Sequence, residues 1–138
     1  MVSIRIYNGF WNVSYVLDHP KCAFIFGDND QGTGKKGQAV IRDCQNAYGI
    51  PTKKKPTLEE DAFYTDDEDT QNINHFREAI ESIMIDIKKY DVIYLPVDGL
   101  GTGLSELDKR APKTFAKMNT MIRDMIEILG GDKNMWIY

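Results

Sequence analysis

Two glycine-rich stretches hold the residues that could do chemistry in this chain. Residues 27–39 read GDNDQGTGKKGQA and residues 98–105 read DGLGTGLS. Glycine has no Cβ and takes positive φ easily. Such a loop can therefore turn successive backbone N–H groups toward one point and form an anion-binding concavity. The alternative for each stretch is a tight turn that needs glycine only for its geometry.

Three carboxylates lie in or beside these stretches, at Asp28, Asp30 and Asp98. A carboxylate in such a position can orient a water molecule or a ribose hydroxyl. The other interpretation is a loop carboxylate that caps nearby N–H groups. The two histidines, His19 and His75, lie beside no candidate nucleophile, so we expect no Ser–His–Asp set, and we expect no zinc or other metal site.

Each glycine-rich stretch follows an apolar run, residues 22–26 and 92–97, and each run predicts a buried strand. In open α/β sheets, ligands bind outside the carboxyl ends of the strands. Both stretches are therefore expected to wall one crevice. Before the first stretch, residues 2–7 predict a strand, and Asn8-Gly9 predicts a hairpin turn with a returning strand at residues 12–17.

The other expected elements follow from hydrophobic periodicity and end signals. Residues 37–48 predict a helix with Gly49 at its C′ position, and an extended segment follows from residue 50. The acidic residues 57–69 predict an exposed loop. Helices are expected over residues 72–89 and from Pro112 onward, with a short helical turn at residues 105–110. The apolar residues 134–138 predict a final strand.

The composition narrows the class of protein. A length of 138 residues predicts a single domain, residues 1–138. A net charge of −4 argues against a general nucleic-acid or anionic-membrane binder, although a nucleotide pocket can be positive on an acidic protein. The two cysteines have no metal spacing and predict free thiols. Neither a signal peptide nor an apolar run near ~18 residues is evident, so we expect a cytoplasmic protein.

Two nucleotide-binding fingerprints match poorly. Residues 32–37 fit G-x-G-x-x-G, but residues 28–31 separate the first glycine from the preceding strand. A phosphate loop of the Walker type needs Ser or Thr after its Gly-Lys pair, where this chain has Lys36. A dinucleotide-dependent oxidoreductase or a kinase is therefore the weaker hypothesis. The lysines at 53–55 either hold phosphate or form a solvated loop.

Four segments together resemble the macrodomain family, which binds ADP-ribose, and most closely its small members from bacteria and their phages. The segments are FGDN at 26–29, G-x-x-G-x-A at 34–39, GIPTK at 49–53 and LPVDGLGTG at 95–103. The resemblance implies an α/β, three-layer fold with a mixed central sheet flanked by helices. It also implies ADP-ribose binding and, as in some members, removal of ADP-ribose from proteins or nucleic acids.

The resemblance also implies particular roles. Asn29 matches the residue that contacts the distal ribose, and Gly32, Gly34 and Gly37 match the glycine-rich segment around that ribose. The residues from Gly99 to Gly103 match the loop that wraps the diphosphate. The first stretch departs from the family, because Asp30-Gln31 and Lys35-Lys36 interrupt its glycines.

The sequence therefore predicts a crevice for ADP-ribose or one of its derivatives, with no further cofactor. The expected binding residues are Gly27, Gly32, Thr33, Gly34, Gly37, Gly99, Leu100, Gly101, Thr102, Gly103 and Leu104. If the protein hydrolyses an ADP-ribosyl linkage, the expected catalytic residues are Asn29, Asp28, Asp30 and Asp98. The alternative is a domain of the same fold that binds no ligand and serves as a structural or protein-interaction unit, with the acidic segment 57–69 as its contact surface.

Overall fold

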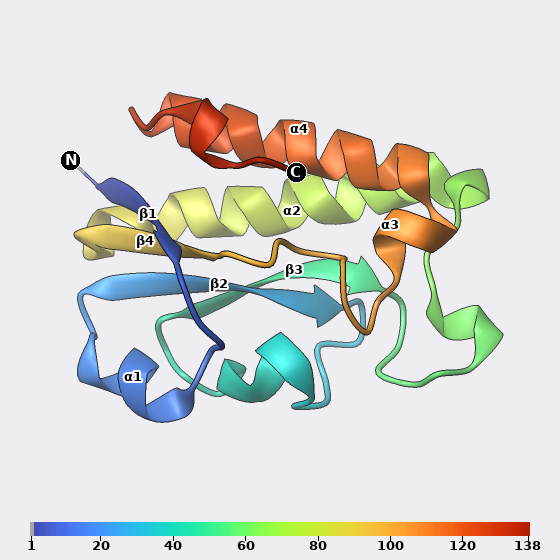
Figure 1. The fold of residues 1–138 in the computed structure, drawn as a ribbon, viewed down its shortest axis with the longest axis horizontal. Helices are drawn as coiled ribbons and strands as arrows, with labels where there is room; N and C mark the ends of the chain where they lie inside the picture. The colour runs from blue at the N-terminus through green and yellow to red at the C-terminus, as the bar shows by residue number, and fades with distance from the viewer. Residues whose placement is uncertain (1) are drawn as a thin grey trace.

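The computed structural model describes residues 2–138 and shows an α/β fold (Figure 1). Its four strands are β1 (Ser3–Tyr7), β2 (Cys22–Asn29), β3 (Ala47–Lys53) and β4 (Val92–Pro96). They form one sheet in the order β1–β4–β2–β3, and every pairing among them is parallel. The carboxyl ends of β2, β3 and β4 therefore share one edge of the sheet.

The sequence predicted a mixed sheet, and this prediction is wrong for the described residues. Its antiparallel strand was to come from residues 12–17, but this segment forms a helix, α1 (Val13–Asp18). The Asn12 side chain caps the helix by accepting a hydrogen bond from Tyr15 N at 2.7 Å. Capping satisfies a donor at the helix start, so the chain crosses over to a parallel β2 instead of turning back in a hairpin.

Helices cover both faces of the sheet. The long helices α2 (Asp69–Asp86) and α4 (Pro112–Ile128) lie on one face, while α1 and the 3₁₀ helix η1 (Gly37–Ile41) lie on the other (Figure 1). Alternation along β2 explains the arrangement, since successive side chains point to opposite faces. Ala23 and Ile25 pack toward the long helices, whereas Phe24 and Phe26 pack toward α1 and η1.

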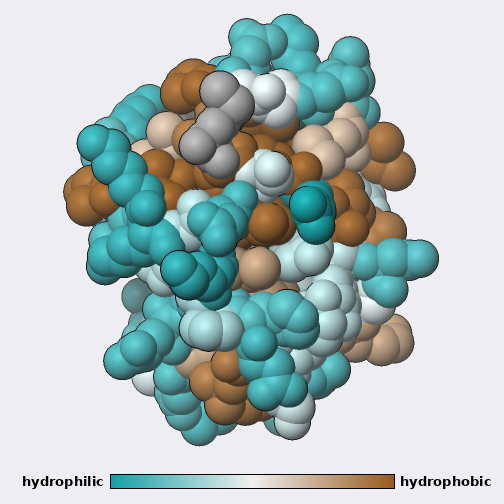
Figure 2. Space-filling model, turned by 90° about the vertical axis from the view of Figure 1, so that its left-hand side faces the viewer, coloured by the Kyte–Doolittle hydropathy of each residue, from teal (hydrophilic) through white to brown (hydrophobic). Residues whose placement is uncertain are grey.

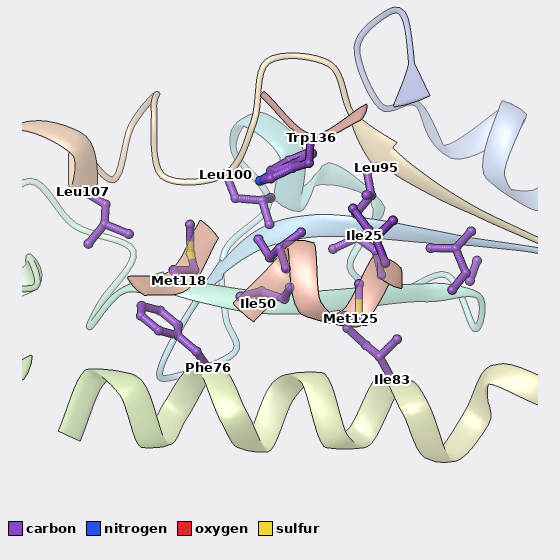
Figure 3. Packing of buried hydrophobic residues seen from close by; sticks show 14 of the residues in the cluster. Ile25, Ile50, Phe76, Ile83, Leu95, Leu100, Leu107, Met118, Met125 and Trp136 are labelled. Carbon is purple, nitrogen blue, oxygen red and sulfur yellow. The ribbon is translucent and has the colours of Figure 1, made fainter. Parts of the chain in front are cut away.

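The larger core lies between the sheet and the long helices, where side chains from β2, β3, β4, α2 and α4 interlock (Figure 3). Trp136 belongs to this core, although it is not part of a strand. Its indole N–H donates to Asn119 Oδ1 of α4 at 2.9 Å. The predicted terminal strand is therefore wrong: the chain ends in a short 3₁₀ helix, η5 (Lys133–Met135), and the last residues pack beneath α4 and beside the loop that follows β4.

The predicted helix at 37–48 is also wrong beyond Ile41. The side-chain amide of Asn46 donates to the carbonyls of Val16, His19 and Cys22, at 2.9, 3.1 and 2.9 Å. These bonds fix a turn before β3, so Gly49 lies inside a strand and not at a helix end. A Cβ on Gly49 would lie 2.5 Å from Asp28 Oδ2, which explains why glycine is needed there.

The acidic segment is not simply an exposed loop. It contains two 3₁₀ turns, η2 (Glu60–Ala62) and η3 (Asp66–Glu68). Ala62, at the end of η2, is buried, and so are Phe63 and Tyr64 between the two turns. The remaining expectations are confirmed in outline. Helix α2 begins three residues before its predicted start and continues into η4 (Ile87–Lys89), α4 begins at Pro112, and a short helix α3 (Leu107–Arg110) follows the second glycine-rich stretch.

The surface at the amino ends of β2 and β4 is largely hydrophilic, with a band of apolar residues across its upper half (Figure 2). Among the helices formed by residues 2–138, none combines the length and the apolar character needed to cross a membrane.

Candidate functional site

A cavity of about 740 Å³ opens at the carboxyl ends of the strands. It lies between glycine loop 1 (residues 27–39) and glycine loop 2 (residues 98–105), as the two apolar strands predicted. Most of the predicted site residues line it: Gly27, Asp28, Asn29, Thr33, Gly34, Gly37, Asp98, Gly99, Gly101, Thr102, Gly103 and Leu104. Asp30, Gly32 and Leu100 do not belong to the lining.

The two loops are joined by the side chain of Gln38. Its Oε1 accepts a hydrogen bond from Gly27 N at 2.8 Å, and its Nε2 donates to Gly99 O at 2.9 Å. The loops also approach each other where a Cβ on Gly37 would lie 3.4 Å from Leu104 Cδ1. One amide side chain thus holds both walls of the cavity at a fixed separation.

Glycine loop 1 is braced by side chains. The Arg42 guanidinium contacts Asp28 Oδ1 at 2.6 Å and donates to the carbonyls of Thr33 and Gly34, at 3.0 and 2.8 Å. The Asn29 amide donates to Thr33 O at 2.7 Å, and its oxygen accepts from Gln31 N at 3.1 Å. The side chains of Asp28 and Asn29 are therefore already engaged in holding the loop.

Glycine loop 2 is held mainly by its backbone. Gly99 and Gly101 have φ of 81° and 80°, values that favour glycine. A Cβ would lie 3.0 Å from the Tyr138 ring at Gly99 and 2.9 Å from the Leu107 side chain at Gly101. Leu100 anchors the loop in the core, where it is fully buried and cannot touch a ligand.

Both loops present backbone donors without partners. In the described part of the chain, the N–H groups of residues 33–37 and 100–105 donate no hydrogen bond to another protein group. Buried or pocket-lining donors are normally satisfied, and a run of free N–H groups in a loop is suited to an anion. The cavity can therefore receive a charged group such as a phosphate without help from a metal ion.

Two of the five charged residues of the lining form ion pairs. Asp28 is bound to Arg42, and Lys35 forms an ion pair with Asp43. Within residues 2–138, Lys36, Lys53 and Asp98 have no ion-pair partner. Asp98 is thus the predicted catalytic carboxylate that lines the cavity and is not held by a cation. No group of three or more potential metal ligands occurs in the same residues.

Asp30 lies outside the cavity lining and contacts the acidic segment and α2 instead. Its carboxylate accepts a hydrogen bond from the Tyr64 hydroxyl, and His75 Nδ1 lies 3.0 Å from the same carboxylate oxygen. Burial raises the pKa of Asp30, and burial together with this carboxylate raises the pKa of Tyr64. These contacts tie glycine loop 1 to the acidic segment and to α2, away from the cavity.

Several lining residues were missed by sequence reasoning: Gly9, Phe10, Trp11, Lys36, Gln38, Thr52, Pro56 and Leu58. Gln38 had no recognisable signal, because its role depends on two backbone groups far apart in the chain. Phe10 is 87% exposed and lies in the turn that was predicted to be a hairpin. Of the three lysines at 53–55, only Lys53 reaches the cavity.

The comparisons with known proteins place the chain in one family. Residues 6–121 match DUF7831, described as a family of unknown function, and the chain belongs to this family. The matched span includes both glycine loops and the strands that precede them. No curated protein and no solved structure matches the chain. The resemblance to macrodomains stays a prediction.

Proposed function

We propose that the cavity binds ADP-ribose or an ADP-ribose derivative. The observation that carries the proposal is the pair of free N–H runs, residues 33–37 and 101–105, in the two glycine loops that line one cavity. A diphosphate is an anion of suitable shape for such a cradle. A cavity of about 740 Å³ falls in the size range of small-molecule sites.

The proposal assigns a part of the ligand to each wall. Glycine loop 2 holds the diphosphate through its N–H groups, and glycine loop 1 surrounds the distal ribose. Since the Asn29 side chain is occupied by Thr33 and Gln31, its contribution is to shape the loop. Helices on both faces of the sheet accord with the three-layer, macrodomain-like arrangement that belongs to this proposal.

We extend the proposal to hydrolysis of an ADP-ribosyl linkage on a protein or nucleic acid. Asp98 is the residue that would orient the attacking water, because it lines the cavity and, within residues 2–138, has no ion-pair partner. Asp28 is engaged by Arg42, and Asp30 is turned toward Tyr64 and His75. Neither is free to act on a ligand in the cavity.

Calorimetric titration with ADP-ribose, AMP, ATP and NAD tests the binding. We expect ADP-ribose to bind more tightly than the other three. If none of the four binds, the cavity does not hold a nucleotide and the ligand-free interaction domain is favoured.

For hydrolysis, Asp98→Asn is expected to keep ADP-ribose binding and to lose turnover of ADP-ribosylated protein and DNA. Equal turnover by this variant and the native protein would contradict the role of Asp98.

A further inference from the structure

The three consecutive lysines at the end of β3 have different surroundings. Lys54 forms an ion pair with Glu68, and Lys55 forms one with Asp61 at 2.6 Å. Lys53, the last residue of β3, is only 8% exposed and lines the cavity. The structure thus separates one buried lysine from two lysines whose charges are already balanced.

The Lys53 ammonium has few partners of its own. It donates a hydrogen bond to Thr57 O at 2.6 Å and lies 4.5 Å from the centre of the Phe63 ring. An ammonium has three donors, and among residues 2–138 no carboxylate oxygen lies within 4.0 Å of it. A buried charge without a counter-ion is costly. The burial lowers the pKa of Lys53.

The nearest carboxylates are committed to another cation. Arg110 lies 3.7 Å from the same Phe63 ring and pairs with Glu60 at 3.0 Å and with Glu106 at 3.5 Å. Two cations therefore lie against the Phe63 ring, and within residues 2–138 Arg110 has carboxylate partners while Lys53 has none. This is the arrangement expected when the counter-ion arrives with the ligand.

We propose that Lys53 is a side-chain ligand for a phosphoryl group bound in the cavity. The proposal rests on the proposed function and deepens it, since it adds a charged partner to a site otherwise built from backbone N–H groups. The Lys53 ammonium donates its remaining N–H groups to the phosphoryl oxygens. Phe63 and Thr57 hold the ammonium in place, so binding requires no reorientation of a long flexible side chain.

The test compares Lys53→Met with Lys55→Met, a matched variant whose ion pair with Asp61 is exposed. Both are titrated with ADP-ribose, with inorganic diphosphate and with uncharged adenosine. Loss of a charge-assisted hydrogen bond is expected to weaken ADP-ribose and diphosphate binding by about 10- to 100-fold in Lys53→Met. Lys55→Met is expected to stay within about twofold of the native protein, and adenosine binding is expected to be unchanged in both. Native affinity for ADP-ribose in Lys53→Met would overturn the proposal.

A measurement on the native protein covers the case in which Lys53→Met does not fold. The ¹³Cε signals of the lysines are followed by NMR as inorganic diphosphate is added. The Lys53 signal is expected to shift and the Lys55 signal to stay in place; an unmoved Lys53 signal at saturation overturns the proposal. If diphosphate moves Lys53 but ADP-ribose does not bind, the proposed function fails while the anion site stands.

Discussion

The two glycine loops wall the same cavity but are held in place by different means. Glycine loop 1 depends on side chains, chiefly Arg42, which binds Asp28 and two loop carbonyls. Glycine loop 2 depends on positive φ at Gly99 and Gly101 and on close packing against Tyr138 and Leu107. Gln38 then joins the two.

Because the two loops are held by different contacts, different substitutions are expected to disturb each of them. A loop held by side chains loses its shape when a side chain is shortened, because its carbonyls and its carboxylate lose their donors. A loop held by glycines loses its shape when a methyl group is added, because neither the dihedral angles nor the packing admits a Cβ. Shortening a side chain should therefore disturb glycine loop 1, whereas adding a methyl group to a glycine should disturb glycine loop 2.

The largest effect is expected for Gly101→Ala. Its φ of 80° is unfavourable for alanine, and the new methyl group would lie 2.9 Å from Leu107 side-chain atoms. We expect the free energy of unfolding to fall by about 2–4 kcal/mol, measured by urea denaturation. The matched control is Gly103→Ala, where a Cβ meets no atom within 4 Å and a change below about 0.5 kcal/mol is expected. Equal losses in both variants would contradict the packing argument.

Arg42→Met removes the side chain that holds glycine loop 1 and is the counterpart of Gly101→Ala in glycine loop 2. The variant leaves Asp28, whose side chain is 17% exposed, without its cation. We expect a loss of about 2 kcal/mol in urea denaturation, less than for a fully buried pair. Lys35→Met serves as the control, because its ion pair with Asp43 is largely exposed and is expected to contribute less than about 0.5 kcal/mol. A negligible effect of Arg42→Met would mean that glycine loop 1 holds its shape without this brace.

The link between the loops is tested by Gln38→Ala. Two hydrogen bonds are lost, with Gly27 N and Gly99 O left unpaired. We expect a stability loss of about 1–2 kcal/mol and weaker ADP-ribose binding by calorimetry, since the walls are no longer held at one separation. Gln38→Glu keeps an acceptor for Gly27 but places a carboxylate oxygen against the Gly99 carbonyl. Its stability and its affinity for ADP-ribose are therefore expected to lie between those of the native protein and those of Gln38→Ala. Native affinity in both variants would show that the loops are positioned independently.

The smallest effect concerns Asp30 and depends on pH. Burial raises the pKa of Asp30 in the folded state above its unfolded value, so the unfolded chain releases this proton at lower pH. The Asp30 contribution is therefore most favourable at low pH and declines as the pH rises from the unfolded pKa through the folded one. Asp30→Asn keeps an acceptor for Tyr64, so its unfolding free energy should gain on that of the native protein as the pH rises above the ordinary aspartate pKa of about 4. A difference in unfolding free energy that does not change with pH would contradict this sign.

Sequence reasoning predicted that the two glycine loops line one cavity, but it predicted several of the surrounding elements wrongly. The apolar runs before each glycine loop were sufficient to predict two strands with adjacent carboxyl ends, because continuous apolar runs mark buried parallel strands. The hairpin at Asn8-Gly9 failed because the cap formed by Asn12 is as local a signal as the turn, and only tertiary packing decides between them. The helix predicted for residues 37–48 failed because three carbonyls from a distant segment hold Asn46.

Within the site, the residue types indicated which loops line the cavity. They did not indicate which polar side chains are already engaged in contacts within the protein. Four polar residues were grouped as catalytic candidates, yet the structure engages Asp28, Asn29 and Asp30 in different contacts and leaves Asp98 beside the cavity. Gln38 contacts two backbone groups that are far apart in the chain, so no local pattern could have selected it. The run of lysines at 53–55 was noticed as a possible phosphate site, but its sequence could not show that only Lys53 lines the cavity.

The central claim is that the N–H groups of both loops receive one anionic ligand. It is tested most directly by following the backbone amide signals of the native protein by NMR during titration with ADP-ribose. We expect saturable shifts at residues 33–37 and 101–105 together, described by a single dissociation constant. Saturation without shifts in these residues, or the absence of any shift at millimolar ADP-ribose, would contradict the claim.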